Sequence, residues 1–219
     1  MNFAKLSTPA ILLVTLTACG GAATTPMPTP TPPPTPVVTP EEEAFAESTL
    51  AFEGVLADTS GEAAAGVAAM NAAPGNADFT GAAVVVVNPV SSGNNLANAD
   101  ASLIGDATFN VNFATGAITG SATDFYGTDG FSSTASVDDY RGTVNLSGGS
   151  IGDVDPNDVS VDYRGTLRGN DQVIGLNGTA SGEFVGNPEI TAVEMATTGA
   201  GSLDGANADV FVYIVAQPD

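Results

Sequence analysis

Residues 108–125 restrict the possible folds more than any other part of this chain, because they read as one β-hairpin. In the first half, Phe109, Val111 and Phe113 alternate with polar residues, which is the period-two pattern of a strand with one face in a core. A short loop then ends in Gly116, where a positive φ is expected, and a second strand-like segment returns. We therefore expect a chain built of antiparallel strands.

Similar short runs, separated by glycine, asparagine and aspartate, continue along the chain. With the hairpin they make eight strands in sequential order, joined mostly by short connections. A meander of this kind loses its exposed edges when it closes on itself. We predict an all-β fold, a single eight-stranded antiparallel up-and-down barrel whose interior is filled by side chains or holds one small ligand. The remaining strands are expected near residues 80–88, 137–147, 158–168, 172–185, 190–198 and 207–216.

One alanine-rich segment, residues 60–70, does not fit the strand pattern. Ser60 is suited to cap the first turn of a helix, and alanine favours helix, but two glycines interrupt the run. We expect a short helix or an ordered loop here, before the barrel.

The N-terminal segment has the pattern of a secretion signal. Lys5 supplies a positive charge and residues 11–16 form an apolar run too short to cross a bilayer. The four residues 16–19, Leu-Thr-Ala-Cys, resemble the lipobox of bacterial lipoproteins. The resemblance implies cleavage before Cys19, attachment of fatty acyl chains such as palmitate to Cys19, and stable membrane anchoring. Gly20, in place of aspartate, favours the outer membrane; the alternative is an ordinary signal peptide that contains a cysteine.

The chain therefore divides into three predicted parts. Residues 1–18 are a lipoprotein signal peptide, residues 19–43 are the lipidated N-terminus with a Pro/Thr-rich linker, and residues 44–219 are the barrel domain. The linker, residues 24–40, alternates proline and threonine and is expected to be extended. At about 3.1 Å per residue it holds the domain roughly 50 Å from the membrane.

The charge of the chain is strongly negative. After cleavage, three arginines stand against 25 acidic residues, a formal charge of −22. Such a surface repels nucleic acid and anionic lipid, so neither is an expected partner. A negative surface favours solubility and the binding of cations or cationic partners, and it is also typical of adaptation to a salty environment. The charge alone does not distinguish between these explanations.

The residue types needed for most catalysis are missing. The chain has no histidine, which removes the commonest general base and metal ligand, and Cys19 is its only cysteine. Residues 58–61, Asp-Thr-Ser-Gly, differ from the Asp-Thr-Gly motif of aspartic proteases by an extra serine, and there is no second copy. We expect a protein that is not an enzyme and binds no cofactor.

One acidic stretch, residues 153–158, has oxygen-bearing side chains at alternate positions, as calcium loops do. Asp158 stands where such a loop needs glycine, and Arg164 stands where the bidentate glutamate belongs. Asp, Pro and Asn are also ordinary turn residues. We therefore predict a strand connection here and assign no metal site.

Two stretches resemble a known family. The sequence of residues 107–125, ATFNVNFATGAITGSATDF, looks like the recurrent hairpin of the transferrin-binding-protein-B-like barrels, which include surface lipoproteins such as factor H binding protein. Residues 175–188 resemble a later Gly-x-Phe-x-Gly stretch of that family, although the chain departs from the pattern after Pro188. The resemblance implies a barrel displayed on the cell surface. It does not identify a partner, because family members bind through surfaces that vary.

The pentapeptide Asp-Tyr-Arg-Gly-Thr occurs twice, at residues 139–143 and 162–166. On the strand pattern both tyrosines face the core and both arginines face outward, and the glycine after each arginine leaves room for a tyrosine ring. If the strands pair so that Arg141 faces Asp162 and Asp139 faces Arg164, the arginines neutralise aspartates and set the register. A different register would leave Arg141, Arg164 and nearby Arg168 together as a contact for an anionic partner.

These observations favour a non-catalytic binding module: an outer-membrane lipoprotein, anchored through Cys19, whose monomeric barrel binds a protein or a small ligand. The alternative is a structural or adhesive acidic envelope lipoprotein with no defined ligand. Loops on a rigid scaffold commonly carry function. Besides the arginines, the candidate contact regions are therefore the glycine-rich connections 91–100, 126–136 and 148–158.

Overall fold

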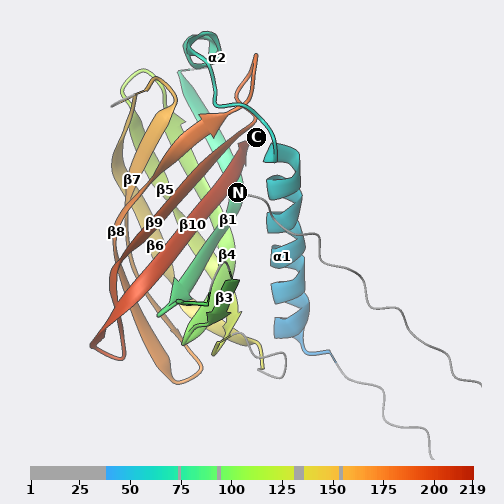
Figure 1. Cartoon of the computed structure of the whole chain (residues 1–219), viewed down its shortest axis with the longest axis vertical. Helices are drawn as coiled ribbons and strands as arrows, with labels where there is room; N and C mark the ends of the chain where they lie inside the picture. The colour runs from blue at the N-terminus through green and yellow to red at the C-terminus, as the bar shows by residue number, and fades with distance from the viewer. Residues whose placement is uncertain (1–37, 74, 93–94, 131–135, 153–154) are drawn as a thin grey trace, which may run out of the picture. The chain divides into compact units, whose positions relative to one another are not determined.

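The computed structural model describes residues 38–73, 75–92, 95–130, 136–152 and 155–219. Eight of its strands form a closed antiparallel barrel (Figure 1), as the sequence predicts. Neighbouring strands follow chain order from β4 to β10, and β1 closes the barrel between β10 and β4. The barrel strands are β1 (Asn76–Val87), β4 (Ala101–Asn112), β5 (Ala117–Thr128), β6 (Asp138–Ile151), β7 (Asp158–Gly169), β8 (Gln172–Val185), β9 (Ala192–Leu203) and β10 (Ala206–Pro218).

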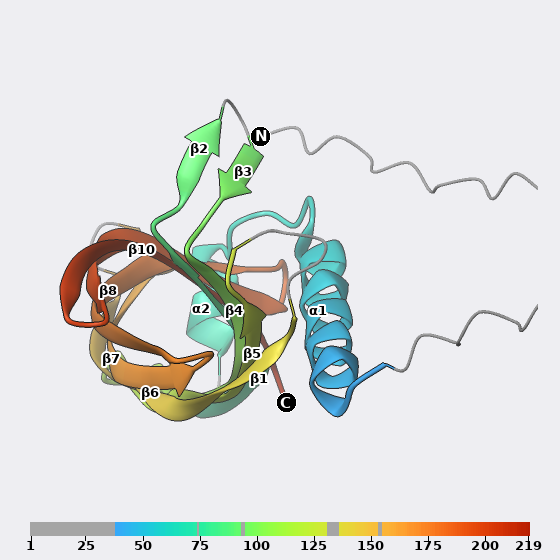
Figure 2. The same ribbon diagram turned by 90° about the horizontal axis from the view of Figure 1, so that it is seen from below.

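The predicted strands are all present, and most are longer than the alternating pattern indicated. The hairpin loop between β4 and β5 has Gly116 at φ 75°, as expected. The long connection from β1 to β4 carries a separate two-stranded sheet, β2 (Val90–Ser92) and β3 (Asn95–Asn98). Viewed along the barrel, these two short strands project outward from the ring of strands (Figure 2).

Apolar side chains fill the barrel. Phe79 stacks on Phe109 with ring centroids 5.5 Å apart, and Phe184 packs against both Phe79 and Phe113. At the other end, Tyr140 and other large side chains are fully buried. These residues belong to one continuous cluster, so the core lies inside the barrel rather than between two layers.

A helix does precede the barrel, but it lies earlier than predicted. α1 (Pro40–Thr59) begins with a capping box, in which Thr39 and Glu42 satisfy each other's backbone amides, and Ser60 is its C-cap rather than an N-cap. In residues 60–70, where the sequence predicts a short helix or an ordered loop, the short helix α2 (Val67–Ala72) begins at Val67. The predicted domain start at residue 44 falls inside α1.

α1 lies along the outside of the barrel (Figures 1 and 2). On the outer wall of the barrel, the side chains covered by α1 are apolar and buried. Val86, Ile104 and Val215 are each at most 5% exposed. Phe52 of α1 meets Tyr213 of β10 edge to face, with centroids 5.8 Å apart. The helix is therefore an integral part of this folded body, because removing it would expose an apolar stripe of the wall.

Candidate binding face

Both copies of the pentapeptide lie where the strand pattern puts them, on neighbouring strands β6 and β7. Tyr140 and Tyr163 are buried inside the barrel, while Arg141 and Arg164 are exposed on its outer wall. The predicted division into inward and outward residues is confirmed.

Of the two registers considered from the sequence, the one that pairs each arginine with an aspartate is wrong, and the structure has a register that brings arginines together. Arg141 lies opposite Arg168, not opposite Asp162, and Arg164 lies opposite Asn145. The position of the hairpin turn explains the difference. The turn is centred near Asp155, and strand pairing continues up to Ile151. The amide of Gly152 donates to the carbonyl of Asp158 over 2.9 Å at the start of the turn. A pairing of Arg141 with Asp162 requires a hairpin centred about three residues earlier in the chain, so the later turn removes the cross-strand ion pairs.

The glycines that accommodate the tyrosine rings are also not the predicted ones. A Cβ on Gly169 would lie 2.8 Å from the Tyr140 ring, and a Cβ on Gly178 would lie 2.5 Å from the Tyr163 hydroxyl oxygen. Gly142 and Gly165 instead approach the backbone of the strand opposite. Each ring therefore crosses the strand that follows in the meander.

The three arginines share one region of the outer wall. Arg141 Nε donates to Asp139 Oδ2 over 3.2 Å, within its own strand, and its side chain remains 87% exposed. Arg164 and Arg168 have no ion-pair or hydrogen-bond partner for their side chains within the described residues. Like charges directly opposite each other on a sheet are destabilising, so the pairing of Arg141 with Arg168 opposes folding rather than favouring it.

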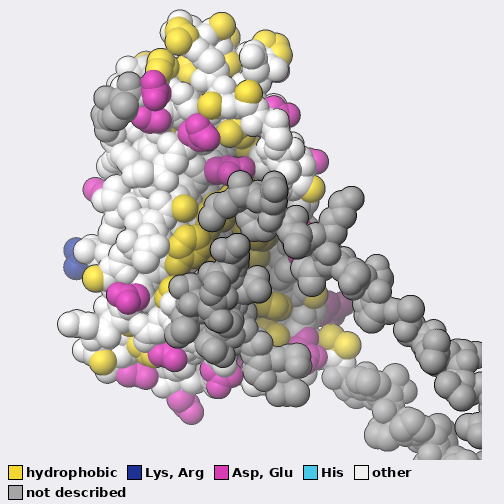
Figure 3. All heavy atoms as spheres, in the orientation of Figure 1, with side chains coloured by type: hydrophobic (Ala, Val, Ile, Leu, Met, Phe, Trp, Pro, Cys, Tyr) yellow, Lys and Arg dark blue, Asp and Glu magenta, His cyan; other side chains and the backbone are white. Residues whose placement is uncertain are grey.

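Around the arginines, the outward side chains include neutral hydrogen-bonding groups as well as Asp139 and Asp162, each two residues before an arginine on the same strand. Thr143 lies opposite Thr166, and Arg164 lies between Asn145 on β6 and Asn177 on β8. We call the set Arg141, Thr143, Asn145, Arg164, Thr166, Arg168 and Asn177 the arginine face. Figure 3 shows acidic side chains scattered over one face of the molecule and a basic side chain only at its edge.

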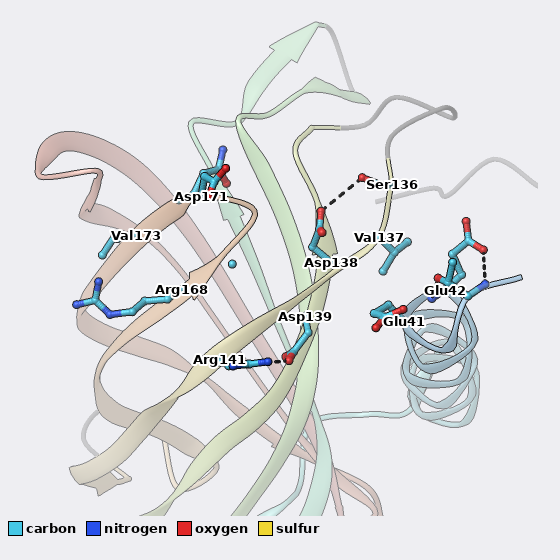
Figure 4. Close-up of a pocket in the computed structure, with 13 residues that line it drawn as sticks. Glu41, Glu42, Ser136, Val137, Asp138, Asp139, Arg141, Arg168, Asp171 and Val173 are labelled. Carbon is cyan, nitrogen blue, oxygen red and sulfur yellow. Dashed lines mark hydrogen bonds and ion pairs between the residues drawn. The ribbon is translucent and has the colours of Figure 1, made fainter.

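A hollow of about 810 Å³ borders the arginine face, between the first turn of α1 and strands β6 to β8. Arg141 and Arg168 line it together with the acidic residues Glu41, Asp139 and Asp171, among others. Figure 4 shows Arg141 turned toward Asp139 and Arg168 extended away from α1. The hollow therefore changes from carboxylate-rich beside the helix to cationic at the arginine face.

Further carboxylates lie outside the hollow, on β4, β5 and α1. Burial raises the pKa of Asp106, and the nearby carboxylates of Asp124 and Glu47 raise it further. Burial likewise raises the pKa of Tyr126, with Asp139 the largest of the contributing charges. Among the described residues no three metal-ligating side chains of His, Cys, Asp or Glu gather as a metal site would require.

The other sequence candidates lie apart from the arginine face. Residues 153–154 of the acidic stretch are outside the described residues; at Asp155 the chain turns, and its amide donates to Asp158 Oδ2 over 2.9 Å. Asp58, of the protease-like motif, lies in the last turn of α1 and accepts from Gln217. Cys19 is also outside the described residues.

The connections expected to carry binding are partly strand. β5 continues to Thr128, β6 continues to Ile151, and the first connection contains β2 and β3. Parts of all three, residues 93–94, 131–135 and 153–154, are not among the described residues. The candidate face is therefore on strands, where side-chain spacing is set by the sheet.

Comparisons with known proteins name no relative: no family model, no curated protein and no solved structure matches this chain. The barrel itself agrees with the fold implied by the resemblance to the transferrin-binding-protein-B-like barrels, but no family match supports that membership. In the described part of the chain, no helix combines the length and apolar character needed to cross a membrane.

The chemistry of the arginine face is recognition of anions. A guanidinium group presents a planar fork of N–H donors that pairs two at a time with carboxylate, phosphate or sulfate oxygens. Hydroxyl and amide groups beside it can donate further hydrogen bonds. Sequence reasoning identified all three arginines, and the register decided that two of them stand side by side.

Proposed function

We propose that this protein is a lipid-anchored outer-membrane lipoprotein whose barrel is a non-catalytic binding module, and that the arginine face binds an anionic partner. The lipobox-like segment at Cys19 supports the anchor. The apolar filling of the barrel supports contact through its outer wall rather than through a large internal cavity.

The observation that carries the proposal is the pairing of Arg141 with Arg168. The chain has only four positive residues, and two of them occupy opposed positions where they repel each other. An anion placed between them converts that repulsion into two charge-assisted attractions. Arg164, four residues before Arg168 on the same strand, adds a third contact roughly 13 Å further on, which suits an anionic polymer or an acidic protein surface.

The test uses residues 20–219, which retain the whole described body, and heparin as the anionic polymer. A protein with so large a negative charge is not expected on a heparin column unless a local site holds it. We expect retention at low ionic strength and elution as salt is raised. The triple variant Arg141→Gln, Arg164→Gln, Arg168→Gln is expected to pass through unretained.

A second triple variant controls for net charge. Asn71→Asp, Asn76→Asp and Thr119→Glu add the same negative charge at exposed positions on α2, β1 and β5. This variant keeps the arginines and is expected to remain bound. Equal loss in both variants, or no retention of the parent, contradicts the arginine face and favours a structural acidic coat without a ligand.

The anchor is tested separately in cells. Labelled palmitate is expected to enter the full-length protein and to be lost from the Cys19→Ala variant, with the parent protein in the outer-membrane fraction. A labelled protein accessible to added protease on intact cells would support surface display. If the parent protein takes up no palmitate label, the N-terminal segment is an ordinary signal peptide and Cys19 is not lipidated.

A further inference from the structure

The seam between β8 and β9 is open over four residues. The register pairs run from Ile174 to Leu176, stop, and resume at Ser181 with the same alignment. Residues 177–180 and 197–200 therefore face each other without ladder pairing, while the wall is closed on both sides of them. The ladder that pairs β8 with β9 on either side is therefore interrupted along this stretch, where peptide groups of both strands point toward each other.

A buried hydroxyl lies behind this gap. Tyr163 is 1% exposed, and its hydroxyl is the one buried side-chain oxygen or nitrogen among the described residues with no hydrogen-bond partner. The two glycines nearest to it are Gly178 on β8 and Gly199 on β9, both inside the unpaired stretch. The hydroxyl therefore points at the gap from inside the barrel.

The inner side of the gap also has free space. If Gly199 carried a Cβ, the one heavy atom within 4 Å would be the Tyr163 hydroxyl oxygen, at 3.4 Å. Other inward-facing strand glycines are crowded: a Cβ on Gly105 would lie 2.6 Å from the carbonyl oxygen of Thr123 across the strand. Thr197 and Gly199, which face inward on β9, remain partly accessible, unlike Met195 on the same strand at 1%.

We propose that this gap, lined by residues 177–180, residues 197–200 and the hydroxyl of Tyr163, is a binding site for a small neutral amide. The peptide edges offer both donors and acceptors, and an amide is the group that matches both. The tyrosine hydroxyl donates to the amide oxygen, which gives a buried polar group the partner it lacks in the protein.

The lining sets the size and charge of the ligand. Four strand residues span roughly 13 Å, and the closed wall at both ends excludes a longer inserted strand. None of the residues 177–180 and 197–200 is charged. The nearest charged positions in the register, Asp162, Arg164 and Asp209, lie one strand away on the outer face. The gap shares Asn177 with the arginine face, but it has no charged lining residue and therefore differs from that face in chemistry.

The test probe is N-methylacetamide, titrated into residues 20–219 with tyrosine rings labelled for NMR. The chain has four tyrosines and no tryptophan, so each ring can be followed separately. We expect saturable shifts of the Tyr163 ring and of the Gly178 and Gly199 amides at millimolar concentrations, with Tyr126 unchanged. The affinity is expected to be weak because so few atoms make contact.

Three variants make the test specific. Gly199→Ala fills the space at ordinary contact distance and is expected to abolish binding without unfolding the barrel. Tyr163→Phe keeps the ring and removes the hydroxyl, and is expected to weaken binding about two- to tenfold, the value of one hydrogen bond. Tyr140→Phe, which removes a hydroxyl elsewhere in the core, is expected to bind as the parent does.

Chemical shifts that increase linearly with N-methylacetamide concentration, and equally for all four tyrosines, would overturn the proposal. Such shifts would reflect only the change of solvent, and the gap would then hold only water. Unaltered amide binding by a folded Gly199→Ala variant would also overturn the proposal. If Gly199→Ala does not fold, equal amide binding by Tyr163→Phe and Tyr140→Phe would overturn it. The arginine variants are expected to bind the amide normally. A failure of the amide-site proposal therefore leaves the heparin result unaffected. Likewise, a failure of the heparin test leaves the amide-site proposal unaffected.

Discussion

The two copies of Asp-Tyr-Arg-Gly-Thr, residues 139–143 on β6 and 162–166 on β7, are identical in sequence and differ in their surroundings. Tyr140 donates its hydroxyl hydrogen to Gln172 over 2.9 Å, whereas Tyr163 has no partner. Arg141 is paired with the aspartate of its own copy, whereas Asp162 accepts from Thr179 instead.

The backbone differs as well. Gly142 has φ 140°, a conformation that favours glycine, while its counterpart Gly165 has no positive φ. The difference teaches that strand neighbours, not the pentapeptide, decide what each residue does. Matched substitutions in the two copies measure that difference.

The largest effect is expected at the glycines. In Gly142→Ala the new Cβ meets the carbonyl oxygen of Thr166 and the backbone is strained as well, so we expect a loss of about 3 kcal/mol or more in the free energy of unfolding. Gly165→Ala meets Thr143 at 2.5 Å without that strain and should cost about 1–3 kcal/mol. Urea unfolding measures both, and equal costs would show that φ is unimportant here.

The next effect is expected at high pH. Burial raises the pKa of Tyr140 to about 12, so the folded protein keeps this proton while the unfolded chain loses it above pH 10. The unfolded state then binds fewer protons, and stability falls as pH rises from about 10 to 12. Tyr140→Phe should remove about 1–3 kcal/mol of that alkaline loss.

Unfolding of parent and variant at pH 8, 10 and 11.5 checks this prediction. Burial raises the pKa of Tyr163 too, so Tyr163→Phe should act in the same direction. An unchanged alkaline slope in Tyr140→Phe would mean that this hydroxyl ionises in the folded protein as it does in the unfolded chain.

At neutral pH the same two substitutions are expected to differ in sign. Tyr140→Phe breaks the bond to Gln172 and should cost about 0.5–1.5 kcal/mol. Tyr163→Phe removes a buried hydroxyl without a partner and should be neutral or stabilising by up to about 1 kcal/mol. Thermal melts at pH 7 compare them; a clear loss in Tyr163→Phe would show that the hydroxyl is already satisfied.

The smallest effects on stability are expected at the aspartates. The Asp139–Arg141 pair is exposed, so Asp139→Asn should cost about 0–1 kcal/mol, and Asp162→Asn should be similar. Their effects on binding should differ. Asp139→Asn frees Arg141 and should raise the salt concentration that elutes the protein from heparin, whereas Asp162→Asn should change it less. Equal shifts would mean that only net charge matters.

The sequence predicts a short helix or an ordered loop before the barrel but places it after residue 60, although the start of α1 carries a helix signal of its own. Thr39 and Glu42 are spaced as in a capping box, with Pro40 at the first helical position. The segment was interpreted as the end of the Pro/Thr linker instead. Alanine, threonine and glycine along the helix weaken its apolar stripe, so the pattern did not stand out before the wall it covers was known.

The sequence by itself determined the strands and their faces, because side-chain direction in a strand is a local property with period two. It placed Tyr140 and Tyr163 inside, the arginines outside, and eight strands in a closing meander. Only the tertiary structure decided the register, because one turn centred on Asp155 shifts every pair between β6 and β7. The opposed arginines, the packing of α1 and the open seam behind Gly199 depend on contacts between distant segments, which no local pattern encodes.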